Sequence, residues 1–451
     1  VRNGLLDWVY QEEIYGRGTF RGYWWSPDSS HVAFLQLNEQ SVHEFAITDH
    51  FQSRLSTETL YYPKAGDQNP TVKLGIVQVS EGTPIWADTE EYKTTPILIV
   101  NVDWTIDSRR VVYQVQDREQ TWLDLNLSDV KSGKSITLFR ETTEAWVNVN
   151  GAATWLDNGE FLWLSERSGW KHIYHYAADG SLIRQITNGS WEVRILHGVS
   201  VTEGVTWVYF SGTERSHIGN DVYRIKIDGD NLARLSATTG THQANFNPSF
   251  THYIDIWSDI STPPQTRLHR SDGTEVRVVD ANQVKLLLEY RLSKSEFMKV
   301  KTRDGFVMEA LMIKPPDFDQ AKKYPVYQHT YAGPHAPQVR NAWGGTRFMY
   351  HQMLAQRGII IWICDNRTAS GKGAISTWPV YRNFGELELR DIEDAIGWLK
   401  QQPYIDGSRI GISGWSYGGY MVNYALTHSK NFTMGISGGS ITDWLNYDTI
   451  Y

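Results

Sequence analysis

The pentapeptide GWSYG at residues 414–418 carries the clearest chemistry of the chain. A strand-like run at 409–416 leads into it, and a helix-like run at 418–429 follows it. A serine between a strand and a helix is the layout of a nucleophile elbow. Flanking glycines let such a turn close and leave the hydroxyl where a carbonyl carbon can approach it. The pattern therefore predicts Ser416 as a nucleophile for acyl transfer.

Acyl transfer also needs hydrogen-bond donors for the charge that develops on the carbonyl oxygen. The backbone N–H of Tyr417, directly after the serine, is one expected donor. The second is expected from a loop after an earlier strand, where Tyr331 precedes the sequence AGP at 332–334. The phenol of Tyr331 can donate this bond, and plain packing is its alternative role.

Two adjacent acids, Glu12 and Glu13, lie in the aromatic stretch DWVYQEEIYGR at 7–17. Neighbouring carboxylates repel each other, so the pair is either washed by solvent or shares one positively charged group. Successive side chains of a strand point in opposite directions, so two acids that share a ligand require a helical or turned segment. Both interpretations stay open on the residues alone.

The composition limits the possible partners. A chain of 451 residues exceeds what one hydrophobic core usually organises, so at least two domains are expected. There is no apolar run of about eighteen residues, which predicts no membrane span in this segment. The net charge of −8 and the lack of a Lys/Arg-rich run disfavour nucleic acid. Cys364 is the single cysteine and is expected to be a small buried side chain, so the redox compartment stays open.

Residues 20–280 alternate apolar and polar in short runs that are separated by turn clusters such as PDSS and DNGE. A turn between two strands recurs, starting at Trp24, Val102, Ala153, Val201 and Phe246. This spacing suits four-stranded propeller blades of about 40–50 residues. It predicts about five blades, the first incomplete and with an insertion between residues 37 and 100, and a generic β-sandwich is the alternative.

After residue 284 the pattern changes to strands that alternate with helices. The expected strands lie at 297–302, 307–314, 325–333, 359–365, 409–416 and 432–440, and the expected helices at 384–401 and 418–429. Strands that are apolar on both faces indicate a largely parallel sheet covered on two sides. The predicted domains are therefore a partial β-propeller at 1–284 and a partial α/β domain at 285–451. No phosphate loop, metal-ligand cluster or dinucleotide fingerprint is found, so no cofactor or metal is predicted.

The motifs GWSYGG at Gly414, YAGP at Tyr331 and DWVYQEE at Asp7 together resemble the dipeptidyl peptidase IV group of prolyl oligopeptidase-like serine peptidases. The stretches at 61–77 and 444–451 resemble it as well, so the similarity runs through the whole chain. The resemblance implies an eight-bladed propeller joined to an α/β-hydrolase domain, of which this chain lacks the first blades and the C-terminal end. It also implies release of N-terminal dipeptides, Xaa-Pro or Xaa-Ala, from small peptides with a free N-terminus, and commonly a homodimer.

In this family two glutamates bind the α-ammonium group of the substrate, and they match Glu12 and Glu13. An ammonium group carries three donors, and leaving that charge buried without acceptors would be costly. The resemblance implies that this anchor lets only the second peptide bond reach Ser416.

The family's proline-sized pocket matches three aromatic residues, with two further residues beside it: Trp444, Tyr447, Tyr451, Ile441 and Tyr417. Spacings of three and four predict that the first three share one helical face, where a pyrrolidine ring can lie flat. A stripe of core residues is the alternative interpretation.

Three positions depart from the family or match other signals. Gln11 stands where the family often has a third acid, and this difference is expected to matter little. Thr368 stands where a glycine is usual, which leaves the geometry of that loop open. Asn366 begins a sequence that fits a glycosylation acceptor, and chance is the expected explanation.

The partners of a catalytic serine in this fold follow it in the order Asp, then His. The residues that could be mistaken for them are His428, Asp443, Asp448, His329 and His335. His428 should point away from the serine, the two aspartates come too early, and the other histidines precede the nucleophile. The resemblance places the acid and the base beyond Tyr451. The 451-residue polypeptide alone is therefore predicted to have negligible peptidase activity, while the full-length protein is predicted to be active.

Other functions compete with this prediction. A related oligopeptidase or acylaminoacyl peptidase shares the fold but lacks the two-glutamate anchor. A non-catalytic binding relative characteristically lacks the serine that this chain keeps. A lipase or esterase is disfavoured by the propeller, which restricts access to small peptides.

Overall fold

The computed structural model describes residues 1–450. The chain divides into two compact units. The first contains Val1–Arg167, Tyr174–Ile183 and residues 443–450, and the second contains Ser168–Ile173 and Arg184–Thr442. The predicted domain boundary between residues 284 and 285 stays a prediction.

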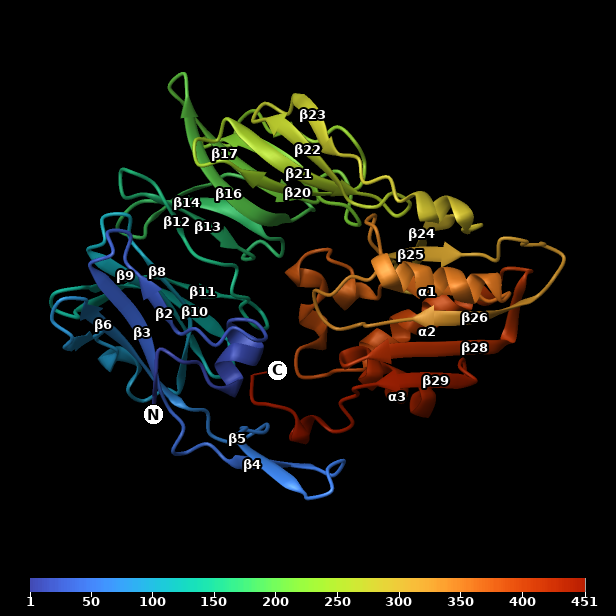
Figure 1. Ribbon diagram of the computed structural model, residues 1–451, viewed down its shortest axis with the longest axis horizontal. Helices are drawn as coiled ribbons and strands as arrows, with labels where there is room; N and C mark the ends of the chain where they lie inside the picture. Colours follow the sequence, from blue (N-terminus) through green and yellow to red (C-terminus); the bar gives the residue numbers. More distant parts are fainter. Residues whose placement is uncertain (451) are drawn as a thin grey trace. The chain divides into compact units, whose positions relative to one another are not determined.

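Five antiparallel sheets follow one another along the first 280 residues (Figure 1). The first three contain β1 (Arg2–Asn3), β2 (Tyr23–Trp25), β3 (His31–Asn38), β6 (Thr71–Gln78) and β7 (Pro84–Trp86); β8 (Ile97–Trp104), β9 (Arg110–Asp117), β10 (Trp122–Asp129) and β11 (Ser135–Thr142); and β12 (Thr154–Trp155), β13 (Phe161–Ser165), β14 (His172–Tyr176) and β15 (Leu182–Gln185). The fourth and fifth contain β16 (Val193–Thr202), β17 (Val205–Gly212), β18 (Asp221–Lys226) and β19 (Ala233–Arg234); and β20 (Thr241–Phe246), β21 (His252–Ser258), β22 (Gln265–Arg270) and β23 (Glu275–Asp280). In the second to fifth sheets, strands that follow one another in the sequence are neighbours, as in propeller blades.

The recurrent turns predicted from the sequence are confirmed. They join β2 to β3, β8 to β9, β12 to β13, β16 to β17 and β20 to β21, which are the same two strands in every sheet. Polar and glycine residues close them, because several turns need a left-handed residue, such as Ser108 at φ +60° and Gly159 at φ +85°. The alternation in β3 then buries Ala33, Leu35 and Leu37 in the core of the first unit.

The first sheet differs from the prediction in one respect and agrees in another. It is not incomplete, because β1 and β2 both pair with β3 and together fill one edge position. The predicted insertion is confirmed: β4 (Glu44–Asp49) and β5 (Ser56–Tyr61) pair only with each other and form a two-stranded ribbon (Figure 1).

The last sheet is mixed and has the order β24-β25-β27-β26-β28-β29. Its strands are β24 (Ser295–Lys301), β25 (Val307–Ile313), β26 (Tyr324–His329), β27 (Ile360–Cys364), β28 (Ile405–Trp415) and β29 (Met434–Gly438). The neighbouring strands β27, β26, β28 and β29 pair in parallel. The pairs β24–β25 and β25–β27 are antiparallel. The sheet is therefore largely parallel, as predicted. All of β27 is buried, and burial raises the pKa of the Cys364 thiol well above its usual range.

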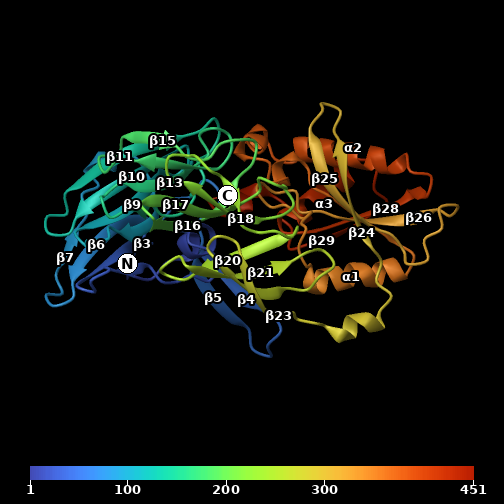
Figure 2. The same cartoon turned by 90° about the horizontal axis from the view of Figure 1, so that it is seen from above.

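Helices cover both faces of this sheet. They are α1 (Gly345–Gln356), α2 (Glu386–Lys400) and α3 (Tyr417–His428), and Figure 2 shows α1 and α2 on opposite faces. The predicted helices correspond to α2 and α3. The sequence analysis did not predict α1, which begins at a glycine and has no acid in its first turn. Among residues 1–450, no helix is both long enough and apolar enough to cross a membrane.

Candidate active site

Ser416 lies between the end of β28 and the start of α3, so the predicted strand–serine–helix geometry is confirmed. Its backbone angles are φ +58° and ψ −119°, a conformation that a residue with a side chain adopts only under constraint. Two backbone bonds supply that constraint: Ser416 donates to the Gly438 carbonyl at 2.9 Å and accepts from the Tyr420 N–H at 3.0 Å. The role of the hydroxyl as nucleophile stays a prediction.

The glycines on either side of Ser416 are required by close backbone contacts. A Cβ atom at Gly414 would lie 2.3 Å from the Gly418 carbonyl oxygen, and one at Gly418 would lie 2.5 Å from the Thr330 carbonyl oxygen. Real Cβ atoms do not approach other atoms this closely. The expectation that flanking side chains would collide is therefore confirmed, and the chain after β26 takes part in the collision.

The two expected oxyanion donors lie in the same unit as the serine. Tyr331 follows β26, and its ring centroid lies 6.2 Å from that of Tyr417. Tyr417 is the first residue of α3 and its ring is fully buried, where its hydroxyl donates to Glu388 of α2. The side chain of Tyr417 is thus committed to the core, and the expected donor is its backbone N–H. Ile441 is also buried in this unit.

The two adjacent acids lie on one turn of π-helix, η1 (Tyr10–Ile14), in the first unit. Asp7 starts this turn, because its carboxylate accepts the Tyr10 N–H at 3.1 Å and its carbonyl accepts the Gln11 N–H at 3.0 Å. The prediction that this segment is helical or turned is confirmed. The side chain of Gln11 accepts the Gly18 N–H and so binds its own loop.

Glu12 and Glu13 have different partners. Glu12 pairs with the exposed guanidinium of Arg17. Glu13 accepts a hydrogen bond from the Tyr447 hydroxyl at 3.3 Å and hydrogen-bonds with the carboxyl of Asp448. Burial, followed by the charge of Asp448, raises the pKa of Glu13 to about 7, and burial raises the pKa of Asp448 as well. Two neighbouring negative charges are costly in this buried position, so protonation of Glu13 occurs more readily than in water.

Sequence reasoning missed the contribution of Asp448, which it considered only as a rejected triad acid. Its side chain is 3% exposed and also accepts a hydrogen bond from the Trp8 indole. No spacing in the sequence connects this residue to an acid more than four hundred positions away. The only signal was its place in a segment that resembles a substrate pocket.

The expectation that the pocket aromatics share one helical face is wrong. The helical part is a single 3₁₀ turn, η7 (Trp444–Asn446), which Asp443 caps by accepting the Leu445 N–H at 2.9 Å. Tyr447 is already extended, because its carbonyl accepts the Ala65 N–H and Asp448 forms a bridge with Lys64. These bonds to another segment outcompete a second helical turn.

Two of the three aromatics still lie together despite this difference. The rings of Trp444 and Tyr447 meet edge to face at 5.9 Å. Both belong to the first unit, with Glu12 and Glu13, while Tyr417 and Ile441 belong to the second. Tyr451 lies outside the described residues.

The histidines near the serine in the sequence have other surroundings. His428 is the last residue of α3, is exposed, and stacks on Tyr424 at 4.1 Å. His329 packs against His351, and burial lowers its pKa to about 4. Among residues 1–450, no histidine hydrogen-bonds the Ser416 hydroxyl. The location of the acid and the base stays a prediction.

The loop in which Thr368 departs from the family has a defined geometry. Thr368 is fully buried in a 3₁₀ turn, and its hydroxyl donates to the carbonyl of Ala332, next to Tyr331. Asn366 is 1% exposed, so the glycosylation sequence that it begins is not accessible in the folded protein.

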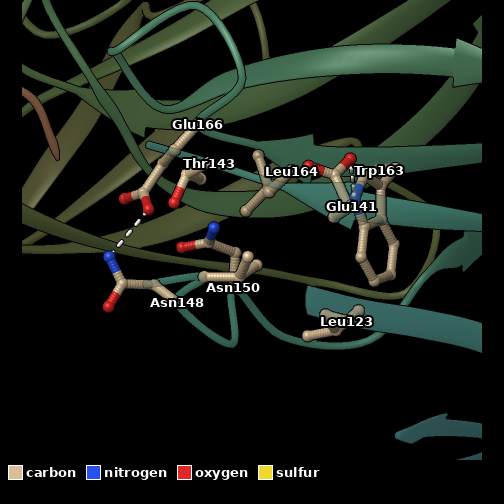
Figure 3. Close-up of a pocket in the computed structure, with 9 residues that line it drawn as sticks. Leu123, Glu141, Thr143, Asn148, Asn150, Trp163, Leu164 and Glu166 are labelled. Atoms are coloured by element: carbon tan, nitrogen blue, oxygen red, sulfur yellow. Dashed lines mark hydrogen bonds between the residues drawn. The ribbon is translucent and has the colours of Figure 1, made fainter. Parts of the chain in front are cut away.

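A small cavity in the first unit is lined by two buried acids and their partners (Figure 3). Glu166 accepts a hydrogen bond from Asn148 at 2.7 Å, drawn as a dashed line in Figure 3, and Glu141 accepts one from the Trp163 indole. The acids are thus satisfied by neighbouring side chains. Within the described part of the chain, no group of three or more His, Cys, Asp or Glu residues could hold a metal ion.

Comparison with known families covers most of the chain. The dipeptidyl peptidase IV (DPP IV) N-terminal region matches residues 1–264, and the prolyl oligopeptidase family matches residues 346–451.

Curated relatives extend over the whole chain. Dipeptidyl peptidase 4 of Trichophyton equinum is 28% identical over 480 residues, which cover 100% of this chain and 60% of the relative. A probable dipeptidyl-aminopeptidase B of Emericella nidulans is 30% identical and is matched over 52% of its length. The chain therefore spans about three fifths or less of these relatives.

Solved structures of similar proteins have the same fold as this chain. The crystal structure of Porphyromonas gingivalis dipeptidyl peptidase 4 superposes with a TM-score of 0.92 at 30% identity, over 100% of this chain and 63% of that one. A putative dipeptidyl aminopeptidase IV from Bacteroides ovatus has the same fold, with a TM-score of 0.86 at 24% identity over 96% of this chain and 64% of that one. The predicted fold, part of a β-propeller followed by part of an α/β-hydrolase domain, is confirmed. The chain belongs to the dipeptidyl peptidase IV family of prolyl oligopeptidase-like proteins.

Proposed function

We propose that the full-length protein containing this chain is a serine exopeptidase that releases N-terminal dipeptides, Xaa-Pro or Xaa-Ala, from peptides with a free N-terminus. One observation carries the proposal: Glu12 and Glu13 lie on a single π-helical turn, with a tyrosine hydroxyl and a third carboxyl group beside Glu13. Relatives named dipeptidyl peptidase 4 support the same reaction.

Glu12 and Glu13 bind the α-ammonium group of the peptide. The ammonium group has three donors, and ionised carboxylates are its strongest acceptors. Its arrival opposes the raised pKa values of Glu13 and Asp448, because a bound cation favours the ionised form of both acids. An N-acylated peptide lacks this charge and gains nothing from the acids. The anchor therefore selects free N-termini and allows cleavage only after the second residue.

The Ser416 hydroxyl attacks the carbonyl carbon of the second residue, and its proton passes through the base to the leaving nitrogen. The peptide C–N bond breaks, the rest of the peptide leaves as a free amine, and the dipeptide stays on Ser416 as an ester. The Tyr417 N–H and the Tyr331 phenol donate to the oxyanion that develops in the transition state. Water then hydrolyses the ester and releases the dipeptide. A serine without its base is a poor nucleophile near neutral pH, so the 451-residue polypeptide alone has negligible activity.

The side chain of the second residue binds between aromatic rings. Trp444 and Tyr447 offer faces on which a proline ring packs. The boundary between the propeller and the hydrolase domain lies near residue 284. The full-length protein assembles as a homodimer, and a measurement of its mass in solution tests this.

The test is the pair of substitutions Glu12→Gln and Glu13→Gln in the full-length protein. Each substitution removes one carboxylate acceptor from the buried α-ammonium group of the peptide. Loss of one partner of a buried charge pair typically costs about 2–5 kcal/mol of binding free energy. We expect kcat/KM for an Xaa-Pro chromogenic substrate to fall at least about thirtyfold. Glu90→Gln is the matched control, because this exposed glutamate of the same unit pairs only with Lys93.

Three outcomes would overturn the proposal. Equal activity of the glutamine variants, or a preference of the parent protein for N-acylated peptides, would favour an acylaminoacyl peptidase. Failure of a fluorophosphonate to label Ser416 in the full-length protein would favour a non-catalytic binding relative.

A further inference from the structure

The loop after β27 is hydrogen-bonded to the loop after β26, which carries Tyr331. Thr368 donates its hydroxyl to the Ala332 carbonyl at 2.8 Å, and the Asn366 amide donates to the same oxygen at 3.3 Å and to the Thr368 hydroxyl at 2.6 Å. All three residues are at most 2% exposed. These bonds are therefore shielded from water, which would otherwise compete for them.

Thr368 holds both ends of the turn after Tyr331. Its side chain binds Ala332, and its own carbonyl accepts the His335 N–H at 3.0 Å. Both Ala332, at φ +67°, and His335, at φ +57°, have left-handed backbone conformations. Residues with a Cβ atom adopt this conformation only where the surroundings enforce it, and the bonds to Thr368 supply that enforcement.

The loop after β27, which contains Thr368, is itself bound to helix α2 of the α/β core. Arg367, which precedes Thr368, donates its backbone N–H and its guanidinium group to Asp391 of α2 at 2.8–3.0 Å. The carboxylate of Asp391 is fully buried, and Arg367 also binds Asp304. A buried and bidentate pair of this kind fixes a loop far better than an exposed ion pair does.

Gly333 leaves the Tyr331 ring little freedom to move. A Cβ atom at Gly333 would lie 2.7 Å from the ring of Tyr331 and 3.2 Å from that of Tyr417. The backbone at 332–333 and the two rings are thus packed against each other. The conformation of Ala332 consequently determines where the Tyr331 phenol points.

We propose that Thr368 and Asn366 are positioning residues that hold Ala332 in its left-handed conformation and so aim the Tyr331 phenol at the oxyanion. The inference rests on the proposed role of Tyr331 in the function above. Thr368 occupies a position where the family usually has a glycine, which has no hydroxyl to offer.

The test uses the full-length protein and the variant Thr368→Val, which keeps the shape of the side chain and removes the hydroxyl. A donor aimed at the oxyanion acts in the transition state and not in substrate binding. We expect kcat for an Xaa-Pro substrate to fall about 10–100-fold, with KM changed less than about twofold. Thr368→Ser keeps the hydroxyl and should restore kcat to within about threefold of the parent value.

A double-substitution cycle with Tyr331→Phe separates positioning from a general structural role. If Thr368 acts through Tyr331, Thr368→Val has no further effect on kcat in the Tyr331→Phe background. Additive losses, a kcat equal to that of the parent protein, or an equal rise in KM would each overturn the inference. Should Thr368→Val fail to fold, Asn366→Ala tests the same brace in the same cycle.

The outcomes also distinguish this inference from the proposed function. If Tyr331→Phe itself leaves kcat unchanged, the proposed oxyanion role of Tyr331 is refuted. The positioning role of Thr368 is then refuted as well, because it depends on Tyr331. If Tyr331→Phe lowers kcat while Thr368→Val does not, only the brace is refuted.

Discussion

The serine turn and the paired acids are both constrained sites, but the constraint is of a different kind in each. At Ser416 it is steric: glycine neighbours and backbone contacts force a rare conformation. At Glu13 it is electrostatic: burial and a neighbouring carboxylate raise the pKa of the side chain. A steric constraint persists whatever binds, whereas an electrostatic one is relieved by a cation.

This difference suits the proposed roles of the two sites. A nucleophile must stay in one position through every step of the reaction, and a rigid turn ensures this. An anchor for an ammonium group must bind the charged ligand in preference to water. Two buried carboxyl groups meet this requirement, because a bound cation offsets the repulsion between them. Substitutions at the serine turn should therefore lower kcat or stability, whereas substitutions at the paired acids should change the binding of charged ligands and its pH dependence.

The largest effect is expected at the hydroxyl itself. Ser416→Ala in the full-length protein should reduce kcat on the order of 10⁶-fold, because the residual rate comes only from binding and the oxyanion donors. The loss should be the same for free and N-acylated peptides, unlike the loss in the two glutamine variants. Ser408→Ala, at an exposed position near the start of β28 in the same unit, is the control for steady-state kinetics.

The steric constraint can be tested without chemistry. Gly418→Ala places a methyl group against the Thr330 carbonyl and the Tyr331 backbone, so we expect the free energy of unfolding to fall by about 1–3 kcal/mol. Gly397→Ala is the matched control: Gly397 lies exposed in α2 with nothing near its missing side chain. That substitution should stabilise the protein by about 0.5–1 kcal/mol. Equal thermal shifts in the two variants would contradict the steric account.

The electrostatic constraint should respond to pH. Below about pH 7 Glu13 holds a proton, because its pKa is raised to about 7, so a free-amine dipeptide inhibitor should bind more weakly as the pH falls through this value. Asp448→Asn removes the nearby negative charge and lowers the pKa of Glu13. The midpoint of the binding curve should then move to lower pH by about one unit.

Inhibition constants measured between pH 5.5 and 8 check this expectation. An N-acetylated inhibitor serves as the control, because it should bind without this pH dependence in both proteins. An unchanged midpoint in Asp448→Asn would show that Asp448 does not influence Glu13.

The smallest effect is expected beside the acids. Gln11→Glu restores the third acid that is frequent in the family, and its carboxylate can still accept the Gly18 N–H that Gln11 binds. Because this side chain points to its own loop, KM for free-amine substrates should change less than about threefold. A larger change in KM would mean that Gln11 contributes to the anchor.

Much of the architecture could be predicted because local chemistry specifies it. Turn residues at regular spacing revealed the strand pairs that begin each propeller sheet, and the glycines around Ser416 revealed the strand–turn–helix geometry. The requirement that Glu12 and Glu13 lie on a helical or turned segment followed from the directions of neighbouring side chains. In each case the atoms that collide or point apart belong to residues close together in the sequence.

The remaining features depend on residues that the chain brings together from a distance. The sequence predicted a continuous helical face from Trp444 onward, but hydrogen bonds to the segment at 64–65 draw Tyr447 into an extended conformation. The effect of Asp448 on Glu13 and the brace from Thr368 to Ala332 were equally invisible. Their energies depend on burial and on distances between groups that no local pattern contains.

The sequence by itself thus determined the family, the recurrent strand pairs of the propeller sheets and the strand–turn–helix geometry around Ser416, because these follow from residue types and short spacings. Only the tertiary structure decided which carboxyl group raises the pKa of Glu13 and which hydroxyl hydrogen-bonds the loop of Tyr331. Electrostatic coupling and buried hydrogen bonds fall off steeply with distance in space, and distance along the chain does not reveal them.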